Sequence, residues 1–294
     1  MAVESGYVRI GELARRVGVR RELLRAWETR YGLLSPSRSA GGFRLYSDED
    51  ERRVRAMQAQ IARGLSAAEA ARLALEAEAG TDEVEPATAG VERLQRAREE
   101  LREALDAFDD ARANRAFDSL LAAFSTEAVL REVVLPYLAE LGARWSRGEA
   151  SVAQEHFASN VLRGRLLGLA RGWGQGTGPR ALLACAPGEL HDLPLLVFGL
   201  ALRARGWRVT FLGADTPVPT LAEAAATLRP EIIVVSAVSV EPIAAAAGHL
   251  AALDGPWTLA VGGPGARASE VAALGALPLH EGPLEEAEWL TGRT

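Results

Sequence analysis

Residues 10–31 read Ile-Gly-Glu-Leu-Ala-Arg-Arg-Val-Gly-Val-Arg-Arg-Glu-Leu-Leu-Arg-Ala-Trp-Glu-Thr-Arg-Tyr. Apolar residues recur at helical spacing over residues 10–18 and again over 21–31, and a tight turn starting at Gly18 separates the two segments. Two short helices joined by such a turn are typical of a helix-turn-helix, whose second helix lies in the DNA major groove. The stretch therefore predicts a small helical domain able to bind DNA.

The residues that follow extend this domain. Residues 35–46 contain Gly41-Gly42 between two short extended pieces, which predicts a β-hairpin. Ser47-Asp-Glu-Asp50 is typical of a capped helix start, and Gly64-Leu-Ser66 separates two further helices. Residues 1–76 are therefore expected to form a winged helix-turn-helix domain.

Charge is distributed unevenly along the chain. All 33 basic residues are arginine, and the net charge is −6. Residues 1–75 hold 14 arginines and 9 acidic residues, so this part carries +5 and the remainder −11. A basic first part indicates a polyanionic partner. The residues expected to contact DNA are Arg20, Arg21, Arg25, Trp27, Arg30, Tyr31, Arg38, Arg44 and Tyr46.

Composition excludes several other classes of protein. Of the 294 residues, 48% are hydrophobic and one is a cysteine, Cys185, so we expect packed cores without an internal disulfide or a cysteine-built zinc site. No run of about 18 apolar residues and no secretory signal pattern occurs, so we expect a cytoplasmic protein without a membrane span.

Two further domains are expected after residue 76. Residues 77–90 are acidic and small and predict a linker. Four amphipathic stretches, near 91–108, 112–123, 126–144 and 151–172, predict a four-helix bundle over residues 91–173. Over residues 178–294, apolar runs at 180–186, 207–212, 231–236 and 257–261 alternate with helical segments. This alternation predicts a flavodoxin-like (Rossmannoid) parallel sheet.

The residues suited to ligand binding follow the predicted strands. In an open parallel sheet, ligands bind beyond the carboxyl ends of the strands. His191 follows the first strand and could bind a metal through one ring nitrogen, while Glu189 or Asp192 fixes the other nitrogen. Small residues at Ser236 and at 262–265 would let a bulky planar ligand approach the backbone.

The helical region supplies a second group of candidate residues. Trp145 precedes Glu155-His156 by ten residues, and Gly148 and a capping box at residues 151–154 separate them into two helices. Trp145 could therefore cover a flat ligand, while Glu155 and His156 point to that ligand from the next helix.

Three motifs of the first domain resemble the MerR family. They are Ile10-Gly-Glu-Leu-Ala, Leu24-Arg-Ala-Trp-Glu-Thr-Arg-Tyr-Gly-Leu and Gly41-Gly-Phe-Arg-Leu-Tyr-Ser-Asp-Glu-Asp. The resemblance covers residues 7–75 and implies dimers bound to pseudo-palindromic promoter DNA. A linker follows where such proteins usually carry a long coiled coil, so oligomer assembly would fall to the C-terminal part.

The last domain resembles cobalamin-binding domains. Glu189, His191, Ser236 and Gly262-Gly263 match their motif, while Pro194 stands at its glycine and Val238 at its leucine. The resemblance implies that His191 is the lower axial ligand of cobalt and displaces the cofactor's own base into a channel beside the sheet.

Nine residues separate Trp145 from Glu155-His156, and this spacing resembles that of the light-sensing cobalamin regulators of the CarH and LitR group. Their pattern implies that Trp145, Glu155 and His156 cap the upper face of adenosylcobalamin. It also implies a DNA-bound repressor tetramer in the dark that light releases. Ser146 stands where that group has a histidine, so either His156 is the upper-side ligand here or the photocycle differs. The residues expected to bind the cofactor are Trp145, Glu155, His156, Glu189, His191, Asp192, Ser236, Val238, Gly262 and Gly263.

Two other functions remain open from the sequence. A regulator of the same architecture could be independent of cobalamin or bind another chromophore such as a tetrapyrrole, as Pro194 and Ser146 would allow. A corrinoid methyl carrier or enzyme subunit would use the same bundle and sheet, but the N-terminal winged helix argues against it. We expect no catalytic residues.

Overall fold

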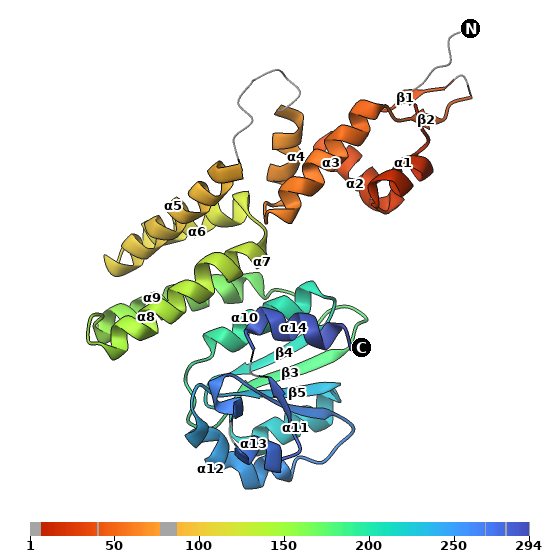
Figure 1. The fold of residues 1–294 in the computed structure, drawn as a ribbon. Helices are drawn as coiled ribbons and strands as arrows, with labels where there is room; N and C mark the ends of the chain where they lie inside the picture. Colours follow the sequence, from red (N-terminus) through yellow and green to blue (C-terminus); the bar gives the residue numbers. More distant parts are fainter. Residues whose placement is uncertain (1–6, 40, 77–86, 268, 280, 294) are drawn as a thin grey trace. The chain divides into compact units, whose positions relative to one another are not determined.

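The computed structural model of the chain describes residues 7–39, 41–76, 87–267, 269–279 and 281–293. Its contacts divide the chain into two compact units, residues 1–140 and residues 141–294. The first unit contains the helix-turn-helix and part of the helical region, and the second contains a parallel sheet (Figure 1).

The first unit starts with the winged helix-turn-helix that the sequence predicts. Its elements are helices α1 (Ile10–Val17) and α2 (Arg21–Tyr31), strands β1 (Ser37–Arg38) and β2 (Arg44–Leu45), and helices α3 (Asp48–Ala62) and α4 (Ala67–Glu76). Helices α1 and α2 end at Gly18 and Gly32, which adopt the left-handed conformation that favours glycine. The predicted cap of α3 is present, since Ser47 Oγ accepts from the N–H of Asp50 and the Asp50 carboxylate accepts from the N–H of Ser47.

The four predicted helical stretches are present. Their elements are α5 (Ala87–Asp106), α6 (Asp110–Ala123), α7 (Thr126–Val129), the π-helical turn η1 (Leu130–Val134), α8 (Leu135–Ser146) and α9 (Val152–Leu169). Because α5 starts at Ala87, the last four residues of the expected linker are helical, while residues 77–86 lie outside the described residues. The boundary between the two units falls within α8, and a single bundle over residues 91–173 stays a prediction.

A short backbone bridge joins two turns of the first unit. Leu65, in the turn between α3 and α4, pairs antiparallel with Phe124, which follows α6, and both side chains are buried. The N–H of Ser125 donates to the carbonyl oxygen of Gly64 at 2.7 Å. The DNA-binding domain is therefore attached to the α6–α7 turn by main-chain hydrogen bonds as well as by the chain itself.

The substitution Gly64→Ala is expected to destabilise this unit by about 1–3 kcal/mol, because Gly64 has a φ of +87° and a Cβ there would lie 2.9 Å from Cβ of Ala128. Thermal or urea unfolding of the full chain measures the loss. Gly32→Ala is the matched control, since Gly32 has a φ of +65° but open space around a Cβ. Equal losses in the two variants would show that the contact with Ala128 contributes nothing.

The second unit contains the predicted parallel sheet, in the order β4-β3-β5-β6-β7. Its elements are β3 (Arg180–Cys185), α10 (Leu193–Ala204), β4 (Arg208–Gly213), α11 (Val218–Leu228), β5 (Ile232–Ser236), α12 (Val240–Ala251), β6 (Thr258–Gly262), the 3-10 helix η2 (Pro264–Arg267), α13 (Ser269–Ala273), β7 (Leu277–Leu279) and α14 (Pro283–Thr291). This strand order is that of flavodoxin-like folds. Helices α10 and α14 cover one face, and α11, α12 and α13 cover the other (Figure 1).

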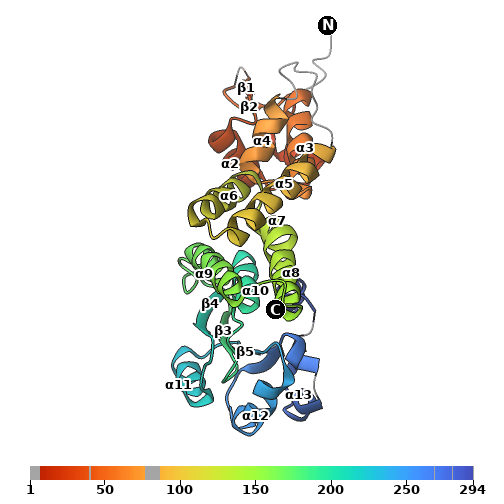
Figure 2. The ribbon, with the colours of Figure 1, turned by 90° about the vertical axis from the view of Figure 1, so that its left-hand side faces the viewer.

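Helix α10 lies between the sheet and α9. It is apolar around most of its circumference, and most of its side chains are buried, as expected for a helix with neighbours on several sides. Helix α9 packs against it (Figure 2). Among the described residues, no helix is long and apolar enough to cross a membrane.

Strand β7 is the one element of the sheet that the sequence pattern did not predict. It has three residues and pairs only with β6, at the edge of the sheet, where Pro278 is tolerated because an edge strand has one unpaired side. Helix α14 follows β7 and packs against α10.

Candidate functional site

Exposed arginines gather on α2 and the hairpin. The exposed residues are Arg20, Arg21, Arg25, Arg30, Arg38 and Arg44. Apart from Arg44, none of them forms an ion pair with another residue that the structure describes. By contrast, Arg53, Arg55 and Arg72 of α3 and α4 pair with glutamates of their own helices. The arginines of α2 are therefore available for phosphates or base edges.

The expectation that Trp27 and Tyr46 contact DNA is wrong, because both side chains are buried in the core of this domain. Tyr46 donates its hydroxyl to Glu28 Oε2 at 2.8 Å, and burial together with this carboxylate raises the pKa of Tyr46. Glu28 Oε1 also lies 3.1 Å from Arg44 Nε. Glu28, which sequence analysis missed, thus holds the hairpin against α2. Tyr31, the third aromatic residue expected to contact DNA, is half-buried.

Arg44→Ala is expected to weaken binding to all DNA sequences alike and to make the slope of log affinity against log salt shallower by about 1, as loss of a phosphate contact does. The reason is that more than half of the Arg44 side chain is exposed despite its contact with Glu28. Titrations of operator and unrelated DNA at several salt concentrations measure both effects. Glu28→Gln keeps the Arg44 charge and should keep the slope; an unchanged slope for Arg44→Ala would remove Arg44 from the interface.

His191 lies on the loop between β3 and α10, at the carboxyl edge of the sheet. Its imidazole is 67% exposed, whereas the carboxylate of Glu189 is 3% exposed. Glu189 Oε1 lies 2.6 Å from His191 Nδ1 and accepts from the His191 backbone N–H at 2.8 Å. Glu189 Oε2 accepts from the backbone N–H of Val238 at 2.7 Å. One buried carboxylate therefore orients the ring and ties this loop to the loop after β5.

Glu189 is held in its charged form. Burial alone would raise its pKa, but hydrogen bonds from the backbone N–H groups of His191 and Val238 and from the His191 ring outweigh burial and lower the pKa below its usual value. Since an ionised carboxylate only accepts, Nδ1 donates the proton of this contact, and Nε2 is the ring nitrogen that does not contact Glu189. Metal-binding histidines are oriented in this way. The structure thus selects Glu189, rather than Asp192, as the partner of His191.

Asp192 faces α9 instead. Its side chain is 6% exposed, and Oδ1 lies 2.7 Å from Nη2 of Arg163 on α9. Burial raises the pKa of Asp192 in spite of this positive neighbour. Sequence analysis missed Arg163, although spacing gave a signal: Glu155, Ser159 and Arg163 follow one another at intervals of four and share one face of α9.

Ser236, Gly262 and Gly263 line a channel beside the sheet, with a volume of about 130 Å³. The other walls come from α10, from the ends of β5 to β7 and from the start of α14; they are Pro194, Leu195, Phe198, Val234, Pro264, Leu279, Glu281, Pro283 and Glu286. A Cβ at Gly263, whose φ is +83°, would lie 2.5 Å from the carbonyl oxygen of Ala237. Glycine is therefore required for the loops after β5 and β6 to touch.

The α8–α9 corner carries the second group of candidate residues. Trp145 is 53% exposed near the end of α8, and the predicted capping box of α9 is present between Ser151 and Gln154. Burial would raise the pKa of Glu155, but hydrogen bonds from Ser159 and His156 and the charges of His156 and His191 lower it overall. The contact between Arg163 and Asp192 is what joins this face of α9 to the loop that carries His191.

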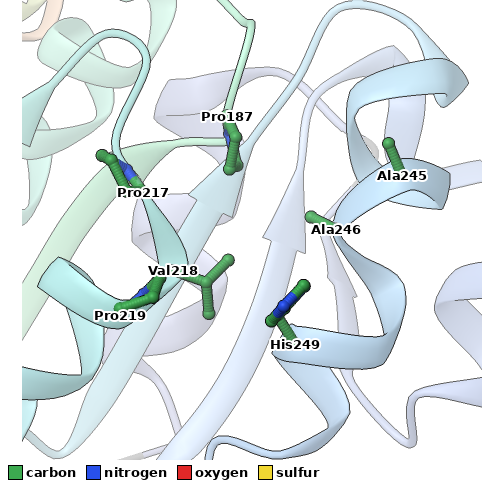
Figure 3. Close-up of a pocket in the computed structure, with 7 residues that line it drawn as sticks. All are labelled: Pro187, Pro217, Val218, Pro219, Ala245, Ala246 and His249. Carbon is green, nitrogen blue, oxygen red and sulfur yellow. The ribbon is translucent and has the colours of Figure 1, made fainter.

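A second pocket lies between α11 and α12 (Figure 3). Its volume is about 280 Å³, and its lining is apolar apart from the ring of His249, which Figure 3 shows beside Val218 and Ala246. No carboxylate lines this pocket, so His249 has no partner there to orient it as His191 is oriented. The structure therefore does not bring His249 into the site around His191.

Comparison with known proteins gives matches over most of the chain. Residues 8–77 match the MerR HTH family regulatory protein family, and residues 97–167 and 179–287 each match a B12 binding domain. The HTH-type transcriptional repressor CarH of Myxococcus xanthus is 38% identical over 238 residues, which are 79% of each chain. The chain belongs to the MerR family of cobalamin-binding transcriptional regulators. The repressor CarA of the same organism is 37% identical over 267 residues, 88% of each chain.

The fold of this regulator also occurs among solved structures. The superposition with the monomethylamine corrinoid protein of Methanosarcina barkeri covers 68% of this chain and 99% of that protein, with 19% identity and a TM-score of 0.57. At that identity the likeness concerns the fold alone. The resemblance to the MerR family and to cobalamin-binding domains, expected from the sequence, is thus confirmed.

The residues at the sheet edge fit a corrinoid. A corrin surrounds cobalt with its own nitrogens, so the protein has to supply only an axial ligand, and His191 Nε2 is available for that. Within the described ranges, no group of three or more His, Cys, Asp or Glu residues could hold a bare metal ion. Leu190, which precedes His191, and Val238, whose N–H donates to Glu189, are exposed and offer apolar surface to a flat ligand.

Proposed function

We propose that this regulator is a repressor that senses light through adenosylcobalamin and binds promoter DNA as an oligomer. The observation that carries the proposal is the His191–Glu189 pair, in which a buried carboxylate engages Nδ1 of an exposed imidazole. His191 would be the lower axial ligand of cobalt. Adenosylcobalamin supplies a cobalt–carbon bond that light cleaves, and the residues of this chain bind and orient it.

The channel beside the sheet would accept the displaced lower base of the cofactor. Its wall from α10 is apolar, with Pro194, Leu195 and Phe198, and suits an aromatic base. Its other wall carries Glu281 and Glu286, whose carboxylates can accept hydrogen bonds from sugar hydroxyls. Ser236 and Gly262 line the same channel at the ends of β5 and β6.

The α8–α9 corner would cover the other side of the cofactor. Trp145 offers an exposed indole for a flat contact, and Glu155 and His156 share a short contact between Oε2 and Nδ1. His156 Nε2 would be the ring nitrogen able to hold cobalt on this side, since Ser146 has no nitrogen in its side chain. Ser146 Oγ donates to the carbonyl oxygen of Ala143.

We infer regulation of DNA binding, rather than catalysis, as the output. The unpaired arginines of α2 would contact the promoter, and two or more copies would be needed to occupy a pseudo-palindromic site. The repressors CarH and CarA resemble this chain over most of its length, which supports repression.

A second candidate function is a regulator of the same architecture whose chromophore differs, such as a tetrapyrrole. Pro194 favours it, because this ring lines the channel at the position where the cobalamin motif has glycine. In helix α10 the proline is unstrained, since it occupies the first turn and needs no hydrogen-bond donor there.

The experiment is to mix the protein with adenosylcobalamin in the dark and record the visible spectrum, the size-exclusion profile and operator binding before and after green light. We expect retained cobalamin, a larger assembly in the dark, and light-induced loss of DNA binding. Cyanocobalamin, which lacks the alkyl group, is the control for light sensitivity. Absence of retained cobalamin, with normal DNA binding, would favour the second candidate.

A further inference from the structure

Arg163 and Asp192 form an ion pair between α9 and the loop that carries His191. We propose that this pair is a positioning contact, which sets the register of the helix carrying Glu155 and His156 against the lower-ligand loop. The inference rests on the proposed function, because the two sides of the site act together only on a ligand held between them.

The position of Asp192 supports this role. It directly follows His191 and is the N-cap residue of α10, yet its side chain makes no hydrogen bond that caps this helix. Capping is the usual use of an aspartate at such a position. Here the buried carboxylate points to α9, with 2.7 Å between Asp192 Oδ1 and Arg163 Nη2.

Helix α9 is held by its C-terminal half. Leu162 and Leu166 are fully buried, and α9 packs on α10, whereas Val152 is 57% exposed and the His156 side chain 71%. Arg163 lies directly after Leu162, so the ion pair belongs to the anchored half of the helix.

The ion pair lies on a defined face of α9. Glu155, Ser159 and Arg163 share that face, and Arg163 pairs with Asp192 at 2.7 Å. A slide of α9 by one turn, about 5.4 Å, would break the pair. The ion pair is therefore specific for one register of α9 against the loop.

The test is the variant Arg163→Met, with Arg163→Lys as the conservative variant and Arg171→Met as the matched control. Arg171 is exposed, lies beyond the end of α9 and forms no ion pair with another described residue. Hydrogen exchange of residues 188–192 is measured in the ligand-free protein. Affinity and visible spectrum are measured with adenosylcobalamin in the dark.

For Arg163→Met we expect faster hydrogen exchange in residues 188–192 and a changed visible spectrum. We also expect the affinity for cobalamin to fall by about 10–100-fold, as it does for other residues that orient a metal ligand. Arg163→Lys should restore most of each property, and Arg171→Met should match the wild type. The inference would be overturned if Arg163→Met had the hydrogen exchange and the spectrum of the wild type. It would also be overturned if Arg163→Lys showed the same losses as Arg163→Met. Failure of the wild type itself to retain cobalamin would count against the proposed function, while the exchange measurement would still decide whether the pair positions the loop.

Discussion

Replacing His191 with alanine is expected to abolish ligation of cobalt by the protein and to lower cobalamin affinity by more than about 100-fold, since loss of residues that merely orient a metal ligand already costs 10–100-fold. The imidazole is exposed, and its Nδ1 is engaged by a buried carboxylate, so no other group of this loop can replace Nε2. The folded structure should survive, because the exposed ring contributes little to the core. The measurement is the dark visible spectrum of protein titrated with adenosylcobalamin, with circular dichroism as the check on folding.

Two companion variants separate ligation from packing. His249→Ala removes an exposed ring in the pocket between α11 and α12 and should leave the spectrum unchanged. Glu189→Gln keeps one acceptor oxygen but removes the charge that fixes the ring, so it should weaken binding less than the loss of His191 does. A wild-type spectrum for His191→Ala would exclude this histidine as the ligand of cobalt.

The helices of the DNA-binding domain could be predicted because their signals are local. Gly18 and Gly32 end α1 and α2, and the Ser47–Asp50 capping box starts α3; each signal acts within a few residues of the chain. The parallel strands were predicted for a similar reason, since strands covered on both faces are continuous apolar runs. Strand β7 could not be predicted, because it has only three residues and its extended conformation depends on pairing with β6, which is distant in the sequence pattern.

The candidate site could be predicted where its residues lie in one motif, and less well where it depends on packing. Glu189 and His191 are two residues apart, and their contact follows from the loop. Arg163 lies 29 residues before Asp192; helical spacing places Arg163 on the face of α9 that carries Glu155, but nothing local indicates Asp192 as its partner. The prediction that Trp27 and Tyr46 contact DNA failed for a related reason. Both lie near basic residues in the sequence, but their rings are in the core while the arginines are exposed.

Replacing both Arg21 and Arg25 with alanine is expected to give the largest loss of DNA affinity among changes in the first domain. The two residues are four apart on α2, so they lie on one face of the helix, and both side chains are exposed. Neither arginine forms an ion pair with another described residue, so no carboxylate in the described part of the domain competes with DNA for their guanidinium groups. A base-edge contact would contribute about 1–3 kcal/mol of discrimination, and a phosphate contact would act on all sequences alike.

Binding of the Arg21→Ala, Arg25→Ala and double variants to operator and scrambled DNA, at several salt concentrations, distinguishes these two kinds of contact. A loss confined to the operator indicates base readout, and an equal loss with a shallower salt slope indicates phosphates. Arg72→Ala is the matched control, because Arg72 is a partly exposed arginine of α4 that already pairs with Glu69 and Glu76. If the double variant bound both DNAs like the control, the exposed arginines of α2 would be a solvated surface, and the basic charge of this domain would have to act through the hairpin instead.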